Sequence, residues 1–335
     1  MNRVARLLWS FACAVLVGCT DGPGVVDAGS DGGSPDETGA WVVKAPLPFG
    51  ARQETAVVAL RGEIVVLAGL DESAVVVGDV SAYDPESDTW RALAPLPVAM
   101  HHANATVVND KIYVLGFLRT LSFTADGRGF VYDPDADTWS PVAALPAGTE
   151  RGGGVAVPDG DGVLVVGGVR AGTAVTEVTR YDPASDTHSV VASLPAPRDH
   201  LVGANLAGTV VVAGGREARI SSHAPTTYAL VDGAWQERAP MPTSRGGMAG
   251  AAVGGRLFVL GGEGDASNET GVFDDVESYD VATDVWTTWS PMARPRHGMG
   301  AAALAGVVYV PGGADIEGLA AVAVHEALVV DDDGA

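Results

Sequence analysis

Short apolar runs recur along the chain, and each ends in glycine or another small residue. Six runs rich in β-branched residues are found at 63–69, 111–116, 162–168, 209–215, 256–262 and 307–313. A second apolar stretch, rich in glycine and alanine, precedes each run, as GMGAAAL (298–304) precedes the last. Runs of this length, closed by glycine, are typical of strands. The hydrophobic pattern therefore predicts an all-β chain.

A polar motif follows several of the β-branched runs and precedes the glycine- and alanine-rich stretch of the next repeat. The stretch YDPESDTW (83–90) recurs as YDPDADTW (132–139), YDPASDTH (181–188) and YDVATDVW (279–286). Proline presets the backbone for the second position of a turn, and the aspartate before it can accept bonds from the turn's own amides. The flanking tyrosine and tryptophan favour strands. The motif predicts a hairpin turn whose aspartates are structural rather than catalytic.

The tryptophans of the motif recur at a nearly constant spacing. Trp41, Trp90 and Trp139 are 49 residues apart, and Trp235 and Trp286 are 51 apart. A period near 50 with four short strands in each repeat gives six repeats in the chain. The sequence therefore predicts a repeat protein in which each unit is a small antiparallel sheet.

The last repeat is incomplete at its C-terminal end. It ends after its third strand, at residue 330, whereas the N-terminal segment AWVVKAPLP (40–48) matches the fourth strand of the first repeat, TWRALAPLP (89–97), position by position. We expect residues 40–48 to form the outer strand of the last unit. Closing the ring in this way removes the exposed edges of the sheets.

The glycine doublet after the second strand, then tyrosine, then tryptophan seven positions later, resembles the kelch β-propeller family over residues 41–330. The resemblance implies a six-bladed propeller with four antiparallel strands per blade, formed by residues 40–330. The departures are local: Ala68 stands in the first doublet, Phe117 in the second, and His188 replaces a tryptophan.

Residues 1–18 are expected to be a signal peptide, because Arg3 and Arg6 precede the apolar stretch 7–17. The residues LVGC (16–19) resemble a bacterial lipobox, which implies a lipid on Cys19; a soluble secreted protein cut near Cys19 is the alternative. Residues 19–39 then form the lipidated cysteine and a disordered tether, and residues 331–335 an acidic tail. The expected location is the bacterial cell envelope, with the outer membrane or cell surface favoured.

Charge and cysteine content narrow the function. The net charge of −22 opposes binding to nucleic acid or to an anionic bilayer. Membrane contact is therefore expected only through the lipid anchor. Cys13 and Cys19 are the two cysteines of the chain, so the propeller has no cysteine for a disulfide. A copper-radical oxidase, which the kelch resemblance would allow, needs a cysteine crosslinked to tyrosine and is not expected.

Antiparallel order places the loops after the second and fourth strands of every blade on one face, opposite the turns with repeated aspartates. Each repeat offers a basic residue as the chain enters its innermost strand: Arg52, His101, Arg151, Arg198, Arg245 and Arg296. His102, His200 and His297 lie beside three of them. Two interpretations remain open, since these residues can contact a ligand or can pack and form hydrogen bonds between blades.

The preferred function is a non-enzymatic, monomeric binding module for a protein, peptide or glycan that offers acceptor oxygens. No cofactor and no metal are expected: clustered histidines suggest a metal, but converging ligands cannot be read from a sequence. The alternative is a sugar-acting enzyme of the sialic-acid mutarotase type. Such an enzyme needs an acid–base carboxylate beside an arginine, a role open to Glu54, Glu150 or Asp199.

Overall fold

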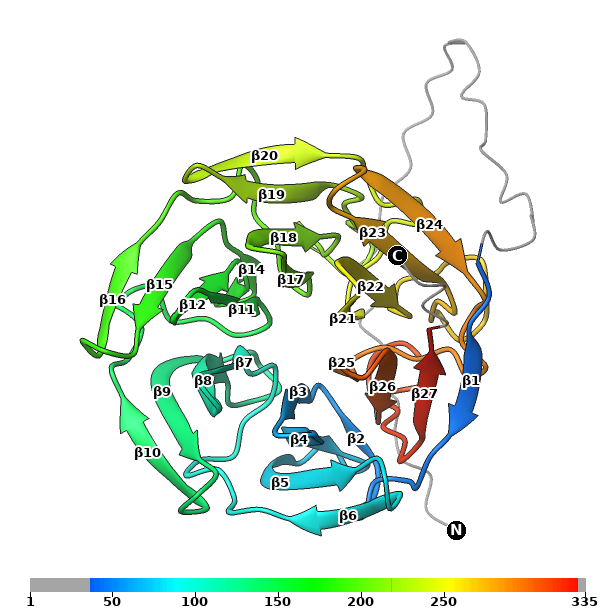
Figure 1. Cartoon of the computed structure of the whole chain (residues 1–335), viewed down its shortest axis with the longest axis horizontal. Coiled ribbons are helices and arrows are strands. Elements are labelled where there is room, and N and C mark those ends of the chain that lie inside the picture. The colour runs from blue at the N-terminus through cyan, green and yellow to red at the C-terminus, as the bar shows by residue number, and fades with distance from the viewer. Residues whose placement is uncertain (1–36, 218, 331–335) are drawn as a thin grey trace, which may run out of the picture. The chain divides into compact units, whose positions relative to one another are not determined.

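Six antiparallel sheets, one for each blade, surround a common axis in the computed structural model, which describes residues 37–217 and 219–330 (Figure 1). The regular secondary structure of these residues is entirely β. Among them, no helix has the length and apolarity needed to cross a membrane. The predicted all-β, six-bladed propeller with four antiparallel strands per blade is confirmed.

Each blade is given from its innermost strand to its outermost strand. Blade 1 contains β3 (Ala56–Leu60), β4 (Glu63–Asp71), β5 (Val76–Asp84) and β6 (Thr89–Ala92), with β2 (Arg52–Gln53) added to β4. Blade 2 contains β7 (Ala105–Val108), β8 (Lys111–Leu118), β9 (Ala125–Asp133) and β10 (Thr138–Val142). Blade 3 contains β11 (Val155–Asp159), β12 (Gly162–Val166), β15 (Val178–Asp182) and β16 (Thr187–Val190), and its loop carries the hairpin of β13 (Val169–Arg170) and β14 (Thr173–Ala174).

The second half of the ring repeats the same order. Blade 4 contains β17 (Val202–Leu206), β18 (Thr209–Ala213), β19 (Thr227–Val231) and β20 (Ala234–Arg238). Blade 5 contains β21 (Ala249–Val253), β22 (Arg256–Leu260), β23 (Val276–Asp280) and β24 (Val285–Trp289). Blade 6 contains β25 (Ala302–Leu304), β26 (Val307–Pro311), β27 (His325–Val329) and β1 (Ala40–Val43).

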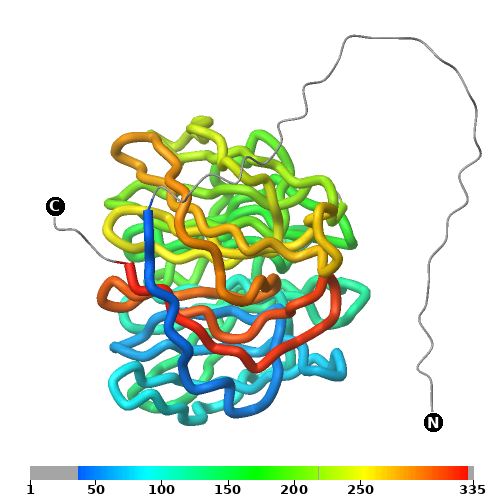
Figure 2. The backbone as a smooth tube through the Cα atoms, turned by 90° about the vertical axis from the view of Figure 1, so that its right-hand side faces the viewer, coloured from blue at the N-terminus to red at the C-terminus, as the bar shows by residue number. Residues whose placement is uncertain are grey.

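Blade 6 closes the ring as the sequence predicts. Strand β1 pairs antiparallel with β27, with Trp41 opposite Leu328, and Figure 2 shows the blue N-terminal strand beside the red C-terminal one. The ladder continues beyond β1, because Lys44 and Leu47 donate their N–H groups to carbonyls of the same blade. Glu37 already forms a bridge with Trp289, so the paired part of the chain begins before residue 40.

The repeated turn links neighbouring blades. In its four copies the tyrosine hydroxyl donates to the aspartate five positions after it, over 2.6–2.8 Å. That aspartate also accepts a backbone N–H from the preceding blade. The first aspartate accepts amides of its own turn, as predicted. The turns are therefore both hairpin corners and bonds between blades.

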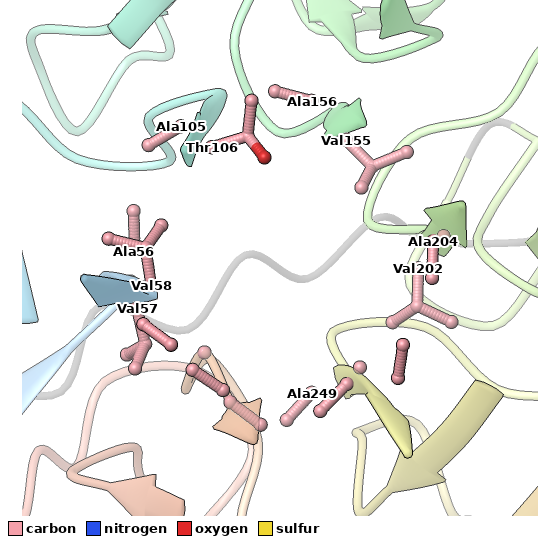
Figure 3. A pocket seen from close by; sticks show the side chains of 18 of the residues that line it. Ala56, Val57, Val58, Ala105, Thr106, Val155, Ala156, Val202, Ala204 and Ala249 are labelled. Carbon is pink, nitrogen blue, oxygen red and sulfur yellow. The ribbon is translucent and has the colours of Figure 1, made fainter. Parts of the chain in front are cut away.

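The innermost strands surround an axial channel of about 410 Å³. Alanine, glycine and valine residues from all six blades form most of its wall, and Figure 3 shows those labelled on β3, β7, β11, β17 and β21. Small residues are required here because the blades are wedges that come closest together at the axis. The expected signal peptide, Cys19 and the acidic tail lie outside the described residues and remain predictions.

Candidate functional site

A closed ring of backbone hydrogen bonds surrounds the axis where the chain enters the six innermost strands. Its members, one from each blade, are Glu54, His102, Gly153, His200, Gly247 and Gly298. Each donates its N–H to the carbonyl of the equivalent residue in the preceding blade, over 2.5–3.2 Å. We call these six residues the axial ring. The ring fixes the positions of any side chains that its members carry.

All members of the axial ring have a positive φ, between 51° and 70°. Three blades meet this requirement with glycine, which adopts such a backbone without a steric penalty. The other three carry Glu54, His102 and His200, which strain the backbone by about 1 kcal/mol or more each. A residue held in this region against its preference is a reason to examine its side chain for function.

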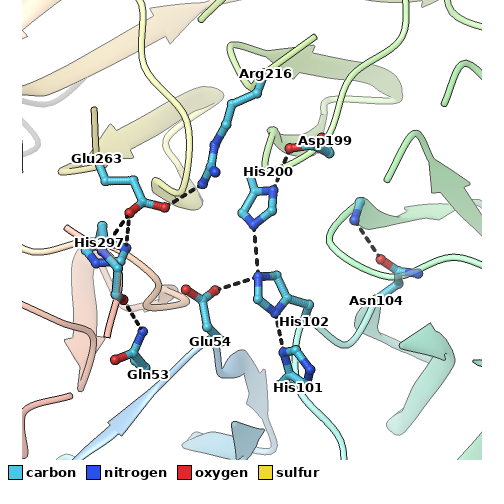
Figure 4. Close-up of polar contacts among 12 residues, drawn as sticks. Gln53, Glu54, His101, His102, Asn104, Asp199, His200, Arg216, Glu263 and His297 are labelled. Atoms are coloured by element: carbon cyan, nitrogen blue, oxygen red, sulfur yellow. Dashed lines mark hydrogen bonds and ion pairs between the residues drawn. The ribbon is translucent and has the colours of Figure 1, made fainter. Parts of the chain in front are cut away.

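The side chains of Glu54, His102 and His200 converge over the axis, and we call them the axial triad (Figure 4). Oε2 of Glu54 lies 3.0 Å from Nε2 of His102. Nε2 of His102 lies 2.9 Å from Nε2 of His200. The side chains of Glu54 and His102 are 12% and 6% exposed, so the three polar atoms meet with little competition from water.

A second layer of groups holds the two imidazoles. Nδ1 of His200 lies 2.6 Å from Oδ1 of Asp199, the residue before it. Nδ1 of His102 lies 2.6 Å from Nδ1 of His101, whose Nε2 faces the carbonyl of Thr120 at 3.1 Å. Both rings are therefore oriented from behind, with Nε2 directed toward the axis.

Burial sets the protonation of this cluster. It lowers the pKa of His101 to about 4, with the neighbouring His102 adding to the effect. Burial also lowers the pKa of His200, and the charge of Arg216 acts in the same direction. Burial alone would raise the pKa of Glu54, but His102, His297 and His200 together hold it well below the usual range. At neutral pH the triad therefore contains the carboxylate of Glu54 and the imidazole of His200, which is a weaker base than usual.

A buried ion pair lies beside the triad. Nη2 of Arg216 contacts Oε1 of Glu263 at 2.6 Å. The other carboxylate oxygen, Oε2, accepts the N–H of Gly318 and lies 3.3 Å from Nδ1 of His297. Arg216 and Glu263 follow the glycine doublets of blades 4 and 5, so this pair bridges neighbouring blades. The Nε atom of Arg216 is buried without a hydrogen-bond partner among the described residues.

These groups line a cavity of about 230 Å³, which we call the mouth cavity. Its polar wall contains the axial triad, His101, Arg216 and Glu263. Its apolar wall is built by Leu70, Leu121, Phe123, Ile220 and Leu319. Leu121 and Leu319 are more than half exposed, so the apolar wall reaches the surface. A cavity with convergent polar groups and an apolar rim is the usual form of a ligand site.

The basic residues predicted for this face lie in two environments. The guanidinium of Arg151 donates to the carbonyls of Thr149, Val165 and Gly167. Arg245 and Arg296 likewise bond backbone carbonyls, and each contacts a buried glutamate. All three side chains are fully buried, and their contacts are those of the packing role that the sequence left open.

The remaining three predicted residues differ from this pattern. Arg52 pairs with Asp79 and Arg198 with Glu217, both half-exposed partners. His101 does not occupy the arginine position, which is a correction: the carbonyl of Met100, not of His101, accepts the N–H of Gly69, as the carbonyl of Arg245 accepts that of Gly215. His101 lies one position further along and lines the mouth cavity.

Of the predicted acid–base carboxylates, the structure brings Glu54 and Asp199 into the cluster, while Glu150 lines a separate crevice with Arg128 and Arg170. Arg216 was missed by sequence reasoning. A usable signal existed, because the residue after the glycine doublet is apolar in the other blades except for Glu263 in blade 5. A charged pair in that otherwise apolar position marks the site.

Comparisons with known proteins agree with this architecture. A kelch motif model matches residues 51–97 and 244–293. The kelch-like protein terF of Aspergillus terreus (strain NIH 2624 / FGSC A1156) is 33% identical over 125 residues, or 36% of this chain. The match spans about a quarter (27%) of that relative's length. A solved structure named "Structure of YjhT" superposes with a TM-score of 0.73 at 15% identity, covering 87% of this chain and 98% of the other.

Proposed function

Since the chain belongs to the kelch-repeat β-propeller family, we propose that it is a binding module whose ligand occupies the mouth cavity. One observation carries this proposal: charged and titratable side chains from four blades converge, nearly buried, on one cavity at the channel end. Burying charged side chains costs free energy, so a buried cluster of them is expected to bind a ligand or to stabilise the fold. The open apolar rim favours ligand binding over a purely structural role.

The cavity favours a ligand group with acceptor oxygens. Arg216 contacts Glu263 through one terminal nitrogen, and its buried Nε has no hydrogen-bond partner among the described residues. A guanidinium fork is suited to planar oxygen pairs such as carboxylates. Leu121, Phe123 and Leu319 would contact the apolar part of the same ligand.

The volume limits how much of the ligand enters. Sites that enclose a drug-sized molecule measure about 300–1,000 Å³, whereas the mouth cavity measures about 230 Å³. It therefore suits one sugar ring or one side chain at the end of a glycan or peptide. The remainder would lie across the exposed rim, where Leu121 and Leu319 are 51% and 59% exposed.

A screen of glycans and carboxylate-bearing peptides against the full chain tests this proposal. For a ligand found in the screen, Arg216→Lys keeps the charge but removes the fork. Hydrogen bonds to charged groups contribute about 1.5–3 kcal/mol, so affinity should fall about ten- to hundredfold. Glu86→Gln, on an exposed turn of the opposite face, is the control. A ligand that loses affinity with Glu86→Gln and not with Arg216→Lys would place the site on the wrong face.

A second candidate is a sugar-acting enzyme of the sialic-acid mutarotase type. It is supported by the carboxylate of Glu54 beside the imidazole of His102, since a base and an acid within reach of one another are needed to open and reclose a sugar ring. Following the interconversion of sialic-acid anomers with the full chain separates the candidates. Acceleration that Glu54→Gln abolishes would favour the enzyme over the binding module.

We further propose that a lipid on Cys19 holds the propeller at the bacterial cell envelope. Support comes from the lipobox-like residues LVGC (16–19) alone. Cys19→Ser should move the protein from the detergent phase to the aqueous phase on detergent partitioning. An unchanged detergent fraction would contradict the anchor.

A further inference from the structure

The hydrogen positions around the axial triad follow from its outer partners. Asp199 offers a carboxylate oxygen to Nδ1 of His200 at 2.6 Å, so that nitrogen carries the hydrogen. In the neutral imidazole the other nitrogen, Nε2, is then a lone pair. This lone pair is directed at His102, 2.9 Å away.

The same reasoning assigns His102. The carbonyl of Thr120 accepts only, so the hydrogen of neutral His101 lies on Nε2 and its Nδ1 is a lone pair. Nδ1 of His102, 2.6 Å from that lone pair, must donate to it. In neutral His102, the Nε2 atom then also carries a lone pair and no hydrogen. It faces both His200 and the carboxylate of Glu54, which is 3.0 Å away.

With both imidazoles neutral, three electron-pair donors therefore face one another with no hydrogen between them. Such an arrangement is repulsive unless a cation lies at its centre, and two cations are available: a proton or a metal ion. We propose that Glu54, His102 and His200 bind a divalent first-row transition metal. Two imidazoles and one carboxylate are a donor set that suits Zn²⁺ and its neighbours. This inference goes beyond ligand binding in the mouth cavity and does not depend on it.

Two of the three pairs of ligand atoms already lie close to the spacing that a metal requires. Metal–ligand distances of about 2.0–2.1 Å in a tetrahedral site place ligand atoms about 3.3 Å apart. The two close pairs of the triad are 2.9 and 3.0 Å apart, and all three ligand atoms lie within 4.8 Å of one another. Shifts of a few tenths of an ångström bring the two close pairs to that spacing. The mouth cavity leaves room for a fourth ligand from solvent or a bound molecule.

The outer partners are those that a metal site requires. Metal-bound histidines usually donate their second nitrogen to a carboxylate or another acceptor, which fixes the ring and strengthens the ligand. Asp199 is the acceptor for Nδ1 of His200, and Nδ1 of His101 is the acceptor for Nδ1 of His102. A purely structural role for the triad explains the presence of these two outer partners less directly.

The backbone supplies independent support. The three triad residues are the members of the axial ring that are not glycine, and they occupy positive φ where Gly153, Gly247 and Gly298 fit without strain. Folding alone therefore favours glycine at all six positions. Three strained residues whose side chains all meet at one point indicate that the side chains are needed there.

Metal binding to the full chain tests the proposal. After removal of metals with a chelator, Zn²⁺ titration calorimetry should find one equivalent bound at pH 7.5, and Co²⁺ should give the visible absorption of a four-coordinate ion. His102→Gly and His200→Gly should each weaken binding by more than the about 10–100-fold typical of losing an outer partner. Asp199→Asn should cause a loss within that range.

The glycine variants also protect the test against misfolding, because they install the residue that three other blades carry at this position and relieve the positive-φ strain. A melting curve for each variant confirms that it is folded. The matched control is His188→Trp, which removes an imidazole elsewhere and restores the tryptophan of the repeat. A folded wild-type chain that binds neither ion would show that the triad holds a proton instead, which overturns the proposal. Equal binding by wild type and both glycine variants would also overturn it. Ligand affinity measured with and without Zn²⁺ shows separately whether the proposed binding function holds.

Discussion

The hydroxyl of Tyr132 lies 2.7 Å from Oδ1 of Asp137 and donates to it. The same oxygen accepts the N–H of Ala94 from blade 1 at 2.8 Å. The indole N–H of Trp139 donates to the carbonyl of Ala94, so both backbone groups of that residue are bonded by blade 2. One tyrosine–aspartate pair thus joins a hairpin turn to the neighbouring blade.

Removing this aspartate should destabilise the propeller. Asp137→Ala leaves the N–H of Ala94 and the buried Tyr132 hydroxyl without their acceptor, which costs about 1–3 kcal/mol. We expect a lower midpoint of unfolding in urea than for the wild type. Glu86→Ala, an exposed change in the equivalent turn of blade 1, is the control. Equal midpoints for the two variants would contradict the role of Asp137 between blades.

The four equivalent aspartates make stability depend on acid. Backbone N–H groups of the preceding blade, and then the tyrosine hydroxyls, lower the pKa of Asp88, Asp137, Asp186 and Asp284. Because these folded pKa values lie below the unfolded value of about 3.9, their stabilisation is present above that pH and is lost as the pH falls through the folded pKa values. The melting temperature should be flat near pH 6 and drop steeply below about pH 4. A smaller acid-induced drop is expected for Asp137→Asn. An equal drop would assign the acid effect to other carboxyl groups.

The buried arginines should prove structural when they are changed. Arg245 contacts Glu277 at 2.5 Å, with both side chains almost fully buried. Arg245→Ala leaves that glutamate without its partner, and breaking a buried pair costs about 3–5 kcal/mol. Arg198→Ala should cost less, because its partner Glu217 is 52% exposed. Thermal unfolding compares them. Equal melting temperatures for the Arg245→Ala and Arg198→Ala chains would contradict a structural role for Arg245.

Ring closure by β1 can be tested by shortening the chain. A chain that begins at residue 50 lacks β1 and leaves β27 as an unpaired edge, so it should unfold at a lower temperature and less cooperatively. A chain that begins at residue 37 retains β1 and serves as the reference. Identical melting curves for the two chains would show that β1 does not stabilise the ring.

The fold could be predicted because its determinants are local and repeated. Each tryptophan, turn aspartate and glycine doublet recurs at a period near 50, and the repetition identifies the blade without tertiary information. Even the closure was readable, since Trp41 stands where the fourth strand of a unit begins. The register near the axis was not. The sequence assigned His101 to the position that is arginine in the other blades, because histidine is basic like arginine. Met100, one residue earlier, occupies that position in the structure.

The contacts between the site residues could not be predicted, because these residues are distant in sequence. His102 and His200 are 98 residues apart and belong to blades 2 and 4. Their contact depends on the position at which each chain segment crosses the axis, and the apolar pattern does not determine that position. Aligning the repeats on the glycines of the axial ring would have indicated Glu54 as the third member, since it stands where Gly298 stands in the last blade.

The axial ring also constrains how such a protein can change in evolution. Each blade contributes one donor and one acceptor to a circle of six bonds, and every bond must keep a length near 3 Å. Duplicating or deleting one repeat would still leave complete sheets at the rim, but it would change the radius of the circle and separate or crowd its bonds. The number of blades is therefore specified at the axis, by backbone geometry, whereas the loops around it remain free to vary.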